Sequence, residues 1–556
     1  MKTIRSMILV SEDEKSNRLG GRELFQSLQA ALREFDLEGE VAISTITDLG
    51  RQDILPLVMV YPEAVIYGPV SPADAHFLVE EHLYKGRIAE RLLAPEGGLT
   101  EGIAWLSARK GALPAEQRVV LQRAGRIDPE SIDDYIVNDG YIALGKALTE
   151  MKPAEVIAEV EKSGLQGRGG AGFSVGRKWG FVAGAAGDPK YVVCNADESE
   201  PGTFKDRLIM EGDPFALVEA ITLAGYAIGA KEGYIYIRGE YGQAYQRLKS
   251  AIKQAHVYGM LGENIFNSGF SFDVHIHAGA GAYVCGEETA LLESLEGKRG
   301  EPRSRPPYPT THGLWGKPTL VNNVESLANV PPILRNGAQW YRMLGTPSSP
   351  GTKVYTIMGQ INTPGVIEVP MGITLREVIS IYAHGMKPGS TFKLAQTGGS
   401  SGSIIPANLQ DTPMDFESFR KAGVSLGSGA LLICDETTCI VDLAKVLLQF
   451  FRFESCGKCT PCRIGTQLAY QTLVRITEGQ GKLTDLDLFP RLFAQMEILS
   501  HCGLGQTSGV PLRDMLKHFR AEVEAHIRDG VCPAGVCPMK AKKNSSRKNA
   551  LLAVTR

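Results

Sequence analysis

The cysteines of the chain are distributed very unevenly, and their spacing is its strongest chemical signal. The first of the ten is Cys194, and eight lie in the last quarter of the chain. Three form the motif Cys456-x2-Cys459-x2-Cys462, whose thiolates can converge on one inorganic cluster. A [4Fe–4S] cube needs a fourth thiolate, and we expect Cys502, in the glycine-rich turn SHCGLG, to supply it. The alternative is a structural zinc site with four cysteine ligands, although such sites usually pair their ligands in two halves.

A second group of cysteines near the C-terminus has looser spacing. Cys532 and Cys537 occur in the segment VCPAGVCP. With one more cysteine and a histidine they could form a small zinc site, and unliganded surface thiols are the alternative. The favoured set is Cys439, His526, Cys532 and Cys537, with Cys434 and His518 as the other candidates.

A run of small residues, GRGGAGF, is the next feature with chemical meaning. Gly167, Gly169 and Gly172 match the pattern G-x-G-x-x-G, but the preceding AEVIAEVEKSGL is helical, so the usual dinucleotide fingerprint is not met. What remains is a series of backbone N–H groups that can face a phosphate or a flat ring. Nearby positive charge and aromatic rings could complete such a site. The side chains concerned are Arg168, Lys178, Phe173 and Phe181.

Polar loops follow three of the predicted strands. NADESEPG follows the strand YVVC, and AYVCGEETA places Glu287 and Glu288 at a predicted helix start. Ligands of open α/β sheets collect at the carboxyl ends of strands, but acids at a helix start also act as caps, which is the alternative for either loop. Asn322 and Asn323 offer two amides that could hydrogen-bond a heterocycle, with a simple turn as the alternative.

The elements that must position these residues suggest a multidomain α/β protein. Strands alternate with helices from about residue 133 to 330, which predicts a mainly parallel sheet with helices on both faces. The first hundred residues form a smaller α/β unit, in which the last helix is predicted over residues 77–93. Residues 352–422 fit a compact mixed β module, and four helical segments over residues 441–526 predict a small bundle.

The composition excludes several classes of protein. The formal net charge is −3, from 59 Lys+Arg and 62 Asp+Glu, which rules out broad electrostatic binding to nucleic acid. A hydrophobic content of 43% is typical of globular proteins, and no apolar stretch is long enough to span a membrane. The apolar run at the N-terminus is too short for a secretory signal and is followed by acidic residues, so we predict a cytoplasmic location. In that reducing compartment, clustered cysteines are typical of metal or redox chemistry.

Taken together and in order, the motifs resemble those of one known family. GRGGAGF, NADESEPG, AYVCGEETA, KPTLVNNVE, SCGKCTPCR and CGLG closely resemble segments of the NADH-binding flavoprotein subunit of respiratory complex I. Relatives of that subunit serve NAD-linked hydrogenases, formate dehydrogenases and electron-bifurcating complexes. The resemblance covers residues 133–527 and implies a Rossmann-like FMN domain, a β-grasp (SLBB) domain and a helical [4Fe–4S] domain. The implied activity is hydride exchange between NAD(H) and FMN and one-electron exchange with the cluster.

The resemblance also assigns residues to each ligand. FMN contacts would fall on Gly167, Arg168, Gly169, Gly170, Lys178, Asn195, Asp197, Glu198, Tyr283, Gly286, Glu287, Asn322 and Asn323. NADH contacts would fall on Phe173, Phe181, Glu200, Glu288, Arg305 and Tyr308. The last two replace lysine and phenylalanine, which keeps the charge and the ring, and NADPH stays open as the alternative substrate. Hydride transfer needs no general acid or base, so Glu198, Glu200 and Glu288 are positional and electrostatic candidates.

The two ends of the chain depart from the family pattern. The first hundred residues resemble a thioredoxin-fold [2Fe–2S] domain, but the cluster positions carry Ser11, Ser16, Asp48 and Gln52. A hydroxyl or amide does not replace a thiolate on iron, so we expect the fold without a cluster, acting as a docking surface. After CPAGVC the chain has only a short basic tail, where some relatives continue into a ferredoxin-like domain. The expected divisions are residues 1–95, 96–132 (linker), 133–343, 344–430, 431–530 and 531–556.

The resemblance implies partners as well. We expect a [2Fe–2S] thioredoxin-fold subunit and a multi-cluster iron–sulfur or catalytic subunit, within a hydrogenase, a formate dehydrogenase or a ferredoxin-linked bifurcating complex. The peripheral arm of complex I is one alternative. A non-enzymatic zinc scaffold is the other.

Overall fold

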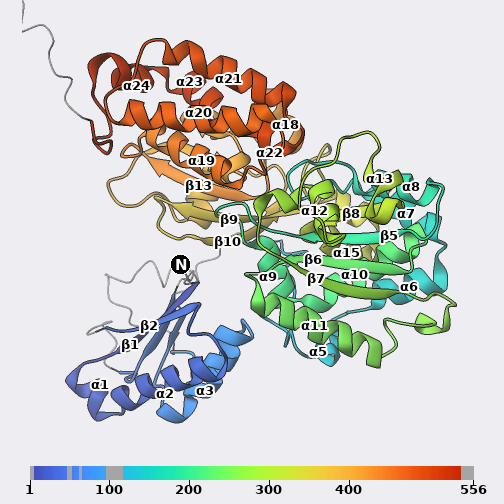
Figure 1. Cartoon of the computed structure of the whole chain (residues 1–556). Helices are drawn as coiled ribbons and strands as arrows, with labels where there is room; N and C mark the ends of the chain where they lie inside the picture. The colour runs from blue at the N-terminus through green and yellow to red at the C-terminus, as the bar shows by residue number, and fades with distance from the viewer. Residues whose placement is uncertain (1–4, 47–52, 62–64, 96–116, 540–556) are drawn as a thin grey trace, which may run out of the picture.

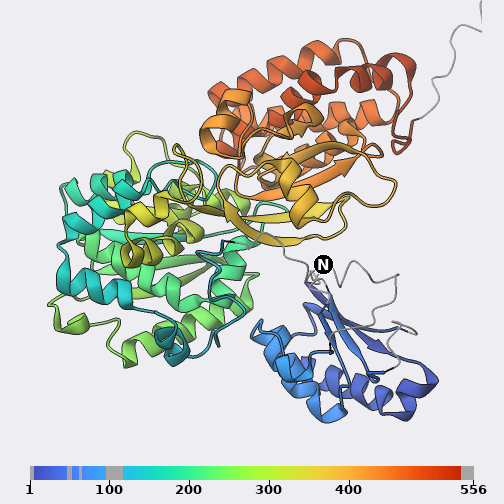
Figure 2. The ribbon, with the colours of Figure 1, turned by 180° about the vertical axis from the view of Figure 1, so that it is seen from behind.

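The computed structural model of the chain describes residues 5–46, 53–61, 65–95 and 117–539. Within these ranges there are three β-sheets, followed by a group of helices. Figures 1 and 2 show the N-terminal unit at one end and the helices at the other, with the other two sheets between them.

The N-terminal unit is a four-stranded sheet with helices packed against it. Its elements are β1 (Ser6–Ser11), α1 (Glu14–Arg18), α2 (Gly21–Glu34), β2 (Val41–Ile46), β3 (Val58–Tyr61), β4 (Val65–Tyr67) and α3 (Ala75–Leu78), which continues as η2 (Val79–Tyr84). The strand order is β2-β1-β3-β4, with β1 parallel to β2 and antiparallel to β3. Ile8 and Val10 of β1 are buried in one apolar cluster with Leu24 and Leu28 of α2.

The helix predicted over residues 77–93 ends earlier, which corrects the sequence-based expectation. η2 stops at Tyr84, and Gly86 adopts a φ of 74°, a left-handed conformation that favours glycine and ends the helix. Leu93 then pairs with Tyr67 in an isolated β-bridge. The second half of the predicted helix is therefore a loop with a short 3-10 turn, Glu90–Leu92.

The second unit is built on a fully parallel sheet, as the sequence predicts. Its strands are β5 (Tyr191–Ala196), β6 (Glu232–Arg238), β7 (Asp273–Gly279) and β8 (Thr319–Asn323), in the order β7-β6-β5-β8. Its helices are α5 (Ile132–Val137), α6 (Ile142–Glu150), α7 (Pro153–Ser163), α8 (Val175–Gly184), α9 (Lys205–Gly212), α10 (Pro214–Ile228), α11 (Gly242–Val257), α12 (Glu288–Leu295), α13 (Pro309–His312), α14 (Val324–Ala328), α15 (Val330–Asn336) and α16 (Ala338–Arg342).

Helix α10 is buried almost all round, although it carries a charged residue. Glu219 in its middle accepts hydrogen bonds from the backbone N–H groups of Tyr141 and Leu144 and from the Tyr135 hydroxyl. Because every buried polar group needs a partner, this carboxylate ties α6 to the central helix.

The third unit is a five-stranded β-grasp (SLBB) sheet. Its strands are β9 (Thr352–Gly359), β10 (Gly365–Pro370), β11 (Phe392–Thr397), β12 (Ile404–Pro406) and β13 (Ala430–Asp435), in the order β10-β9-β13-β11-β12. The short helices α17 (Leu375–Glu377), which continues as η9 (Val378–Tyr382), and α18 (Phe416–Ala422) belong to the same unit. β9 and β13 are parallel, and the other neighbouring strands are antiparallel.

The fourth unit is helical, as predicted. It consists of α19 (Ile440–Glu454), α20 (Thr460–Thr477), α21 (Asp485–Leu499), α22 (Gly503–Thr507), α23 (Val510–His518) and α24 (Arg520–Glu524), which continues as η12 (Ala525–Asp529). In Figure 1 these helices lie above the β-grasp sheet. Among the described residues, no helix has both the length and the apolar character needed to cross a membrane.

The N-terminal unit attaches to α9 and α11 of the parallel-sheet unit through polar contacts. Glu40 forms ion pairs with Arg5 at 3.0 Å and with Arg207 at 2.7 Å. Gln243 donates to the carbonyl of Tyr84 at 2.8 Å, and the Arg247 guanidinium lies over the Tyr84 ring. Such a polar contact resembles a subunit interface more than a shared core.

Candidate functional site

The predicted ligand loops meet at one edge of the parallel sheet, beyond the carboxyl ends of β5, β7 and β8. Asn195, at the end of β5, donates from Nδ2 to the carbonyl of Gly286 at 2.8 Å. A Cβ placed on Gly169 of the glycine-rich loop would lie 3.1 Å from Cβ of Asn323, at the end of β8. The segments GRGGAGF, NADESEPG, AYVCGEETA and TLVNN are therefore brought together as the sequence predicts.

Asp197 supplies the observation that best fits a bound flavin. Its Oδ1 accepts from the Ser199 hydroxyl at 2.9 Å, whereas its Oδ2 is buried and has no hydrogen-bond partner among the described residues. Burial raises the pKa of Asp197 to about 7. A Cβ on Gly286 would come 3.6 Å from Oδ2, so the absent side chain keeps the space beside this oxygen open. A buried acceptor beside a glycine suits a ligand hydroxyl, such as those of the FMN side chain.

The glycine-rich loop has the tight geometry that its sequence predicts. Gly170 and Gly172 have φ values of 117° and 67°, which L side chains rarely adopt. The loop closes on itself through the bond from Gly167 N–H to the carbonyl of Phe173 at 2.8 Å. Its backbone is thus held close to the sheet edge, with no side chains on the glycines to block a ligand.

Arg168 has a different role from the one expected. Its guanidinium is fully buried and donates to the carbonyls of Thr352 at 2.9 Å and Pro350 at 2.7 Å, and to the Tyr341 hydroxyl at 3.1 Å. Its backbone N–H donates to Ser326 Oγ at 2.8 Å. The side chain therefore fastens the loop to the start of β9, and the expectation that it supplies positive charge to a ligand is wrong.

A second correction concerns Glu198. Its carboxylate accepts from the backbone N–H groups of Asp206 and Arg207, both at 2.9 Å, at the start of α9. Burial raises its pKa to about 7, and Asp206 adds to the effect. The capping alternative therefore holds for this side chain, and it does not face the loops as a positional group.

The capping alternative also holds in part for Glu287, and Asn323, for which a simple turn was the alternative, caps a helix as well. Oε2 of Glu287 accepts from Thr289 N–H and Ala290 N–H, both at 2.9 Å, at the start of α12. Asn323 caps α14 through Ser326 N–H, and its amide nitrogen donates to Asp206 at 2.6 Å. Both residues still lie at the sheet edge.

Asn322 is held by a residue that the sequence analysis did not connect with it. Its Oδ1 accepts from Trp179 Nε1 at 2.9 Å, and both side chains are buried. Trp179 lies on α8, just after the glycine-rich loop. No local sequence pattern indicates that its indole would bond to Asn322, which lies far along the chain.

Positive charge at the site comes from Lys178 and Arg305, which both contact Glu288. Lys178 Nζ lies 2.9 Å from Oε2, and Arg305 Nη1 lies 3.1 Å from Oε1. Burial would raise the pKa of Glu288, but the two cations outweigh it and hold the pKa below its usual value. The three residues thus form one charged cluster, with Arg305 taking the place of the family's lysine.

Three aromatic rings predicted to contact NADH are exposed. Phe173 and Phe181 are about half exposed with ring centroids 6.4 Å apart, and Tyr308 is also exposed. Exposed rings on a protein surface are available for stacking with a flat ligand.

The cluster cysteines come together from two loops. Cys456 and Cys459 lie between α19 and α20, Cys462 lies in the first turn of α20, and Cys502 precedes α22. All four cysteines belong to one apolar cluster, and a Cβ on Gly505, three residues after Cys502, would lie 2.9 Å from Cβ of Cys462. Gly457, with a φ of 78°, makes the turn between the first two thiols. Four converging thiols in an apolar surrounding fit a [4Fe–4S] cluster.

Tyr283 of the flavin loop AYVCGEETA packs against Phe450 of α19, the helix that ends just before the first cluster cysteine. Their ring centroids are 5.0 Å apart, and both rings belong to the apolar cluster that contains the four cysteines. Tyr283 N–H donates to Glu454 at 3.0 Å, two residues before Cys456. The two sites are thus joined by packed side chains.

The second metal-binding group is compact, and it is the set favoured from the sequence. The ligand atoms of Cys439, His526, Cys532 and Cys537 all lie within 4.8 Å of one another and are buried. Cys439 Sγ lies 3.3 Å from His526 Nε2 and 3.5 Å from Cys537 Sγ. The other ring nitrogen of His526 lies 2.7 Å from the carbonyl of Glu522, which orients Nε2 toward the thiols. These spacings fit a tetrahedral zinc ion, and the three thiols are buried rather than on the surface.

Ser11 and Ser16, which the sequence analysis assigned to cluster positions, bond to each other in the N-terminal unit. Ser16 Oγ donates to the carbonyl of Ser11 at 2.8 Å, and Leu57 N–H donates to Ser11 Oγ at 2.9 Å. Both serines are buried, so their hydroxyls stabilise the loop that would carry thiolates. Asp48 and Gln52 lie outside the described residues.

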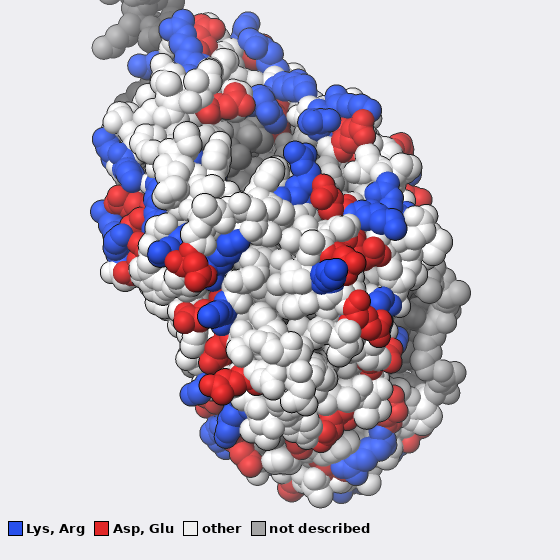
Figure 3. All heavy atoms as spheres, turned by 90° about the vertical axis from the view of Figure 1, so that its right-hand side faces the viewer, with Lys and Arg blue, Asp and Glu red and all other residues white. Residues whose placement is uncertain are grey.

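The protein surface in Figure 3 carries both signs of charge, interspersed. No broad field of one sign covers the described part of this face, in keeping with the net charge of −3.

Three regions of the chain match known family models. Residues 160–332 match the Nuo51 FMN-binding domain, residues 354–405 the SLBB domain, and residues 442–526 the NADH-ubiquinone oxidoreductase-F iron-sulfur binding region.

Similar proteins cover most of the chain. The NADP-reducing hydrogenase subunit HndC of Solidesulfovibrio fructosivorans is 52% identical over 420 residues, which are 76% of this chain and 85% of that protein. The F 2 subunit of NADH-quinone oxidoreductase from Rhizobium meliloti (strain 1021) is 50% identical over 415 residues, 75% of this chain and 99% of that protein. A crystal structure of NAD+-reducing [NiFe]-hydrogenase in the H2-reduced state matches with a TM-score of 0.63 and 31% identity, covering 95% of this chain and 85% of that chain.

Proposed function

The chain belongs to the family of NADH-binding flavoprotein subunits that carry FMN and a [4Fe–4S] cluster, and from this premise we propose which residues carry each step. It is an NADH:acceptor oxidoreductase subunit of a larger redox complex. A bound FMN would supply the conversion between two-electron chemistry with NADH and one-electron chemistry at the cluster. The observation that supports these assignments best is the buried, unpartnered Oδ2 of Asp197 at the sheet edge where the ligand loops meet.

For the flavin, we assign backbone and side-chain groups separately. The N–H groups of Gly169 and Gly170 are the candidates for holding the phosphate or the ring, because no side chain screens them. Gly167, whose N–H bonds to the carbonyl of Phe173, would instead leave room for the ligand. Asp197 would accept a ligand hydroxyl. Asn195, Tyr283, Gly286, Glu287, Asn322 and Asn323 would shape the cavity.

For NADH, we assign the exposed rings and the charged cluster. Phe173, Phe181 and Tyr308 would stack with the nucleotide, while Lys178 and Arg305 would meet its phosphates. Glu288 would hold both cations in place, and Glu200 would contact the nucleotide from the acidic loop.

Single electrons would leave through Cys456, Cys459, Cys462 and Cys502. Tyr283 of the flavin loop and Phe450 of α19 pack together in the apolar cluster that contains these thiols, which would keep water away from the electron path. Hydride transfer needs no proton from the chain. The residues assigned to the ligands would therefore position the nucleotide and the flavin and exclude water from the site.

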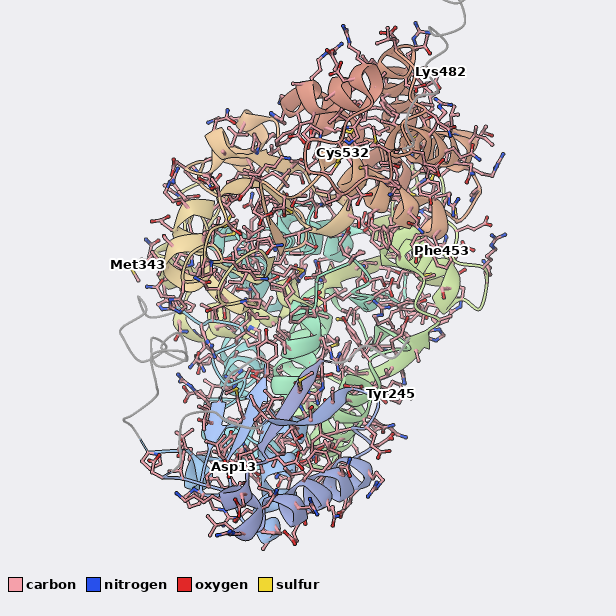
Figure 4. The ribbon with its side chains drawn as sticks, turned by 90° about the vertical axis from the view of Figure 1, so that its left-hand side faces the viewer. Asp13, Tyr245, Met343, Phe453, Lys482 and Cys532 are labelled. Carbon is pink, nitrogen blue, oxygen red and sulfur yellow. The ribbon has the colours of Figure 1, made fainter. Side chains whose placement is uncertain are left out.

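A partner iron–sulfur subunit would dock at the end of the helical unit where the cysteines lie. Four apolar side chains at this end are exposed: Phe453 by 83%, Ile464 by 53%, Ile498 by 75% and Leu499 by 59%. They come from the ends of α19 and α21 and the beginning of α20, and Figure 4 shows Phe453 at the surface. Apolar surface of this kind is typical of protein interfaces.

Among the possible complexes, we favour a hydrogenase of the NAD-linked type, with a ferredoxin-linked complex, a formate dehydrogenase or complex I as alternatives. The support is the extent of the match, since the hydrogenase structure covers 95% of this chain, whereas the two curated relatives cover about three quarters. The N-terminal unit, which we propose is thioredoxin-like, would then serve as a docking surface for a [2Fe–2S] or catalytic subunit. The cytoplasmic location and the domain boundaries stay predictions.

We also propose that Cys439, His526, Cys532 and Cys537 bind zinc. All four ligands belong to the C-terminal part, and Cys439 begins α19 whereas the other three follow α24. A bound ion would therefore fasten the C-terminal segment to the start of the bundle that holds the cluster.

The proposed function is tested on protein purified without oxygen. It should be yellow-brown, release FMN on acid treatment, contain iron and acid-labile sulfide in equal amounts, and reduce methyl viologen with NADH. Colourless protein that contains zinc alone would instead support the scaffold alternative.

A further inference from the structure

We propose that Ser401, in the β-grasp domain, is a positioning residue for NADH, because it fixes the carboxylate of Glu200 at the nucleotide pocket. The inference rests on the proposed function, in which Glu200 contacts NADH. It assigns to the β-grasp domain a direct part in substrate binding.

The contacts of Glu200 cross from one domain to another. Ser401 donates twice, from its backbone N–H to Oε1 at 2.8 Å and from its hydroxyl to Oε2 at 2.9 Å. Tyr283 adds a third bond, from its hydroxyl to Oε2 at 2.7 Å. Glu200 itself is only 9% exposed, so its position depends on these donors rather than on water.

The loop that carries Ser401 is shaped to reach this carboxylate. Gly399 has a φ of 70°, and a Cβ there would lie 2.1 Å from Cγ of Glu200. Gly398 and Gly427 are pressed together in the same way, with a Cβ on Gly398 2.4 Å from Cα of Gly427. Any side chain at these positions would push the loop away, so Gly399 is explained by the close approach to Glu200 and Gly398 by its contact with Gly427.

Two further contacts fasten the acidic loop to the same domain. Thr356 on β9 donates to the carbonyl of Gly202 at 2.6 Å, and the hydroxyls of Thr203 and Ser428 lie 3.1 Å apart. The backbone around Glu200 therefore stays in place when the Ser401 hydroxyl is removed. Such a change would release the carboxylate alone.

A carboxylate held by several donors is ordered before the substrate arrives, and binding then costs less conformational entropy. Without the Ser401 hydroxyl, the carboxylate loses one charge-assisted hydrogen bond and can rotate. Among the described groups assigned to FMN and to the cluster, Tyr283 alone is connected to Ser401, because both hydroxyls donate to Oε2 of Glu200. The expected effect is therefore on NADH binding rather than on electron transfer.

The test compares the KM for NADH and kcat, with ferricyanide as acceptor, in full-length wild-type protein and in S401A, S401T and S403A. S401A should raise KM about tenfold, as expected for the loss of a hydrogen bond to a charged group, with kcat within about twofold and FMN and iron contents unchanged. S401T keeps a hydroxyl and should restore most of the affinity. S403A is the matched control, because Ser403 is a buried serine of the same loop whose hydroxyl accepts from Ser425 N–H within the β-grasp domain.

The possible outcomes distinguish a failure of the proposed function from a failure of the role proposed for Ser401. A wild-type protein with FMN and iron that does not oxidise NADH would overturn the proposed function and this inference with it. An active wild type with an unchanged KM in S401A, or with equal changes in S401A and S403A, would overturn the inference alone. A fall in kcat without a change in KM would also contradict it.

Discussion

At the scale of single residues, the spacing of residues along the chain predicted those parts of the site where only one residue type can do the chemistry. Glycines with positive φ and cysteines at C-x2-C-x2-C have few alternative uses, so their pattern could be interpreted directly. Arg168, Glu198 and Asn323 were harder to interpret. Arg168 bonds to a carbonyl far along the chain, Glu198 caps the helix that follows its loop, and Asn323 bonds to the distant Asp206 carboxylate. Polar side chains of this kind hydrogen-bond to whichever partner the fold brings near, and a single sequence does not show which partner that is.

Asp197 gives a prediction that depends on pH. D197N should weaken FMN binding about tenfold, because the amide loses the charge of the acceptor. The pKa of Asp197 is raised to about 7 by burial, and a hydroxyl donated by FMN would lower it again. Binding then releases a proton, so affinity should increase as the pH rises toward 7 and level off above it.

Flavin fluorescence, titrated into the apoprotein between pH 5 and pH 8, measures this. The phosphate of FMN also titrates in this range, so the comparison is between wild type and D197N, and the difference between them should shrink at low pH. Equal affinities at every pH would exclude Asp197 from the flavin site.

Glu200 gives a second prediction at this scale. E200Q should change the KM for NADH or the turnover, because the amide has no negative charge and cannot accept on its nitrogen. FMN should stay bound, since the glycine loop and Asp197 are untouched. Steady-state kinetics with flavin quantification decides the matter, and kinetics identical to wild type would remove Glu200 from the NADH site.

At the scale of elements, the sequence predicted the parallel sheet and the helical bundle well. Period-2 and helical patterns are local, and the loops at the ends of β5 and β8 meet because parallel strands end at one edge. The end of the predicted helix 77–93 was missed, since a β-bridge from Leu93 to Tyr67 competes with helix continuation. The contact of the GGSSG loop with Glu200 was missed as well, because it joins two domains.

Arg168 tests how the glycine-rich loop is fastened to β9. R168A should lower the free energy of unfolding by about 2–4 kcal/mol, because two buried carbonyls and the Tyr341 hydroxyl lose their donor. Urea denaturation followed by fluorescence measures it. R305A is the control: Arg305 is a third exposed, so its loss should raise the KM for NADH and leave stability within about 0.5 kcal/mol. Equal stability of R168A and wild type would contradict the structural role.

The four-ligand group in the C-terminal part gives a prediction at the same scale. C532S should abolish bound zinc, measured by elemental analysis, and lower the melting temperature, because the ion links α19 to the segment after α24. Iron and FMN should be retained, since their ligands are separate. Iron-loaded wild-type protein without zinc would show that these thiols have another use.

At the scale of the whole molecule, the four units bring the proposed flavin site next to the cluster cysteines. One end of the helical unit carries exposed apolar side chains. The sequence predicted the units but not this surface, because exposed apolar residues on a helix look like core residues in sequence. F453D should therefore prevent copurification of an iron–sulfur partner while ferricyanide reduction by NADH continues. M343D is the control, since Met343 is also exposed, by 71%, and lies on the opposite side in Figure 4. Normal complex formation by F453D would place the partner elsewhere.

The central claim is that a flavin at the sheet edge and a cube on four thiols exchange electrons within this chain. Low-temperature EPR of anaerobic protein, recorded before and after addition of NADH, tests it most directly. NADH should produce a reduced [4Fe–4S] signal in wild type, and C502S should lack this signal although it keeps FMN. Flavin reduction by NADH with no iron–sulfur signal under any reductant would contradict it.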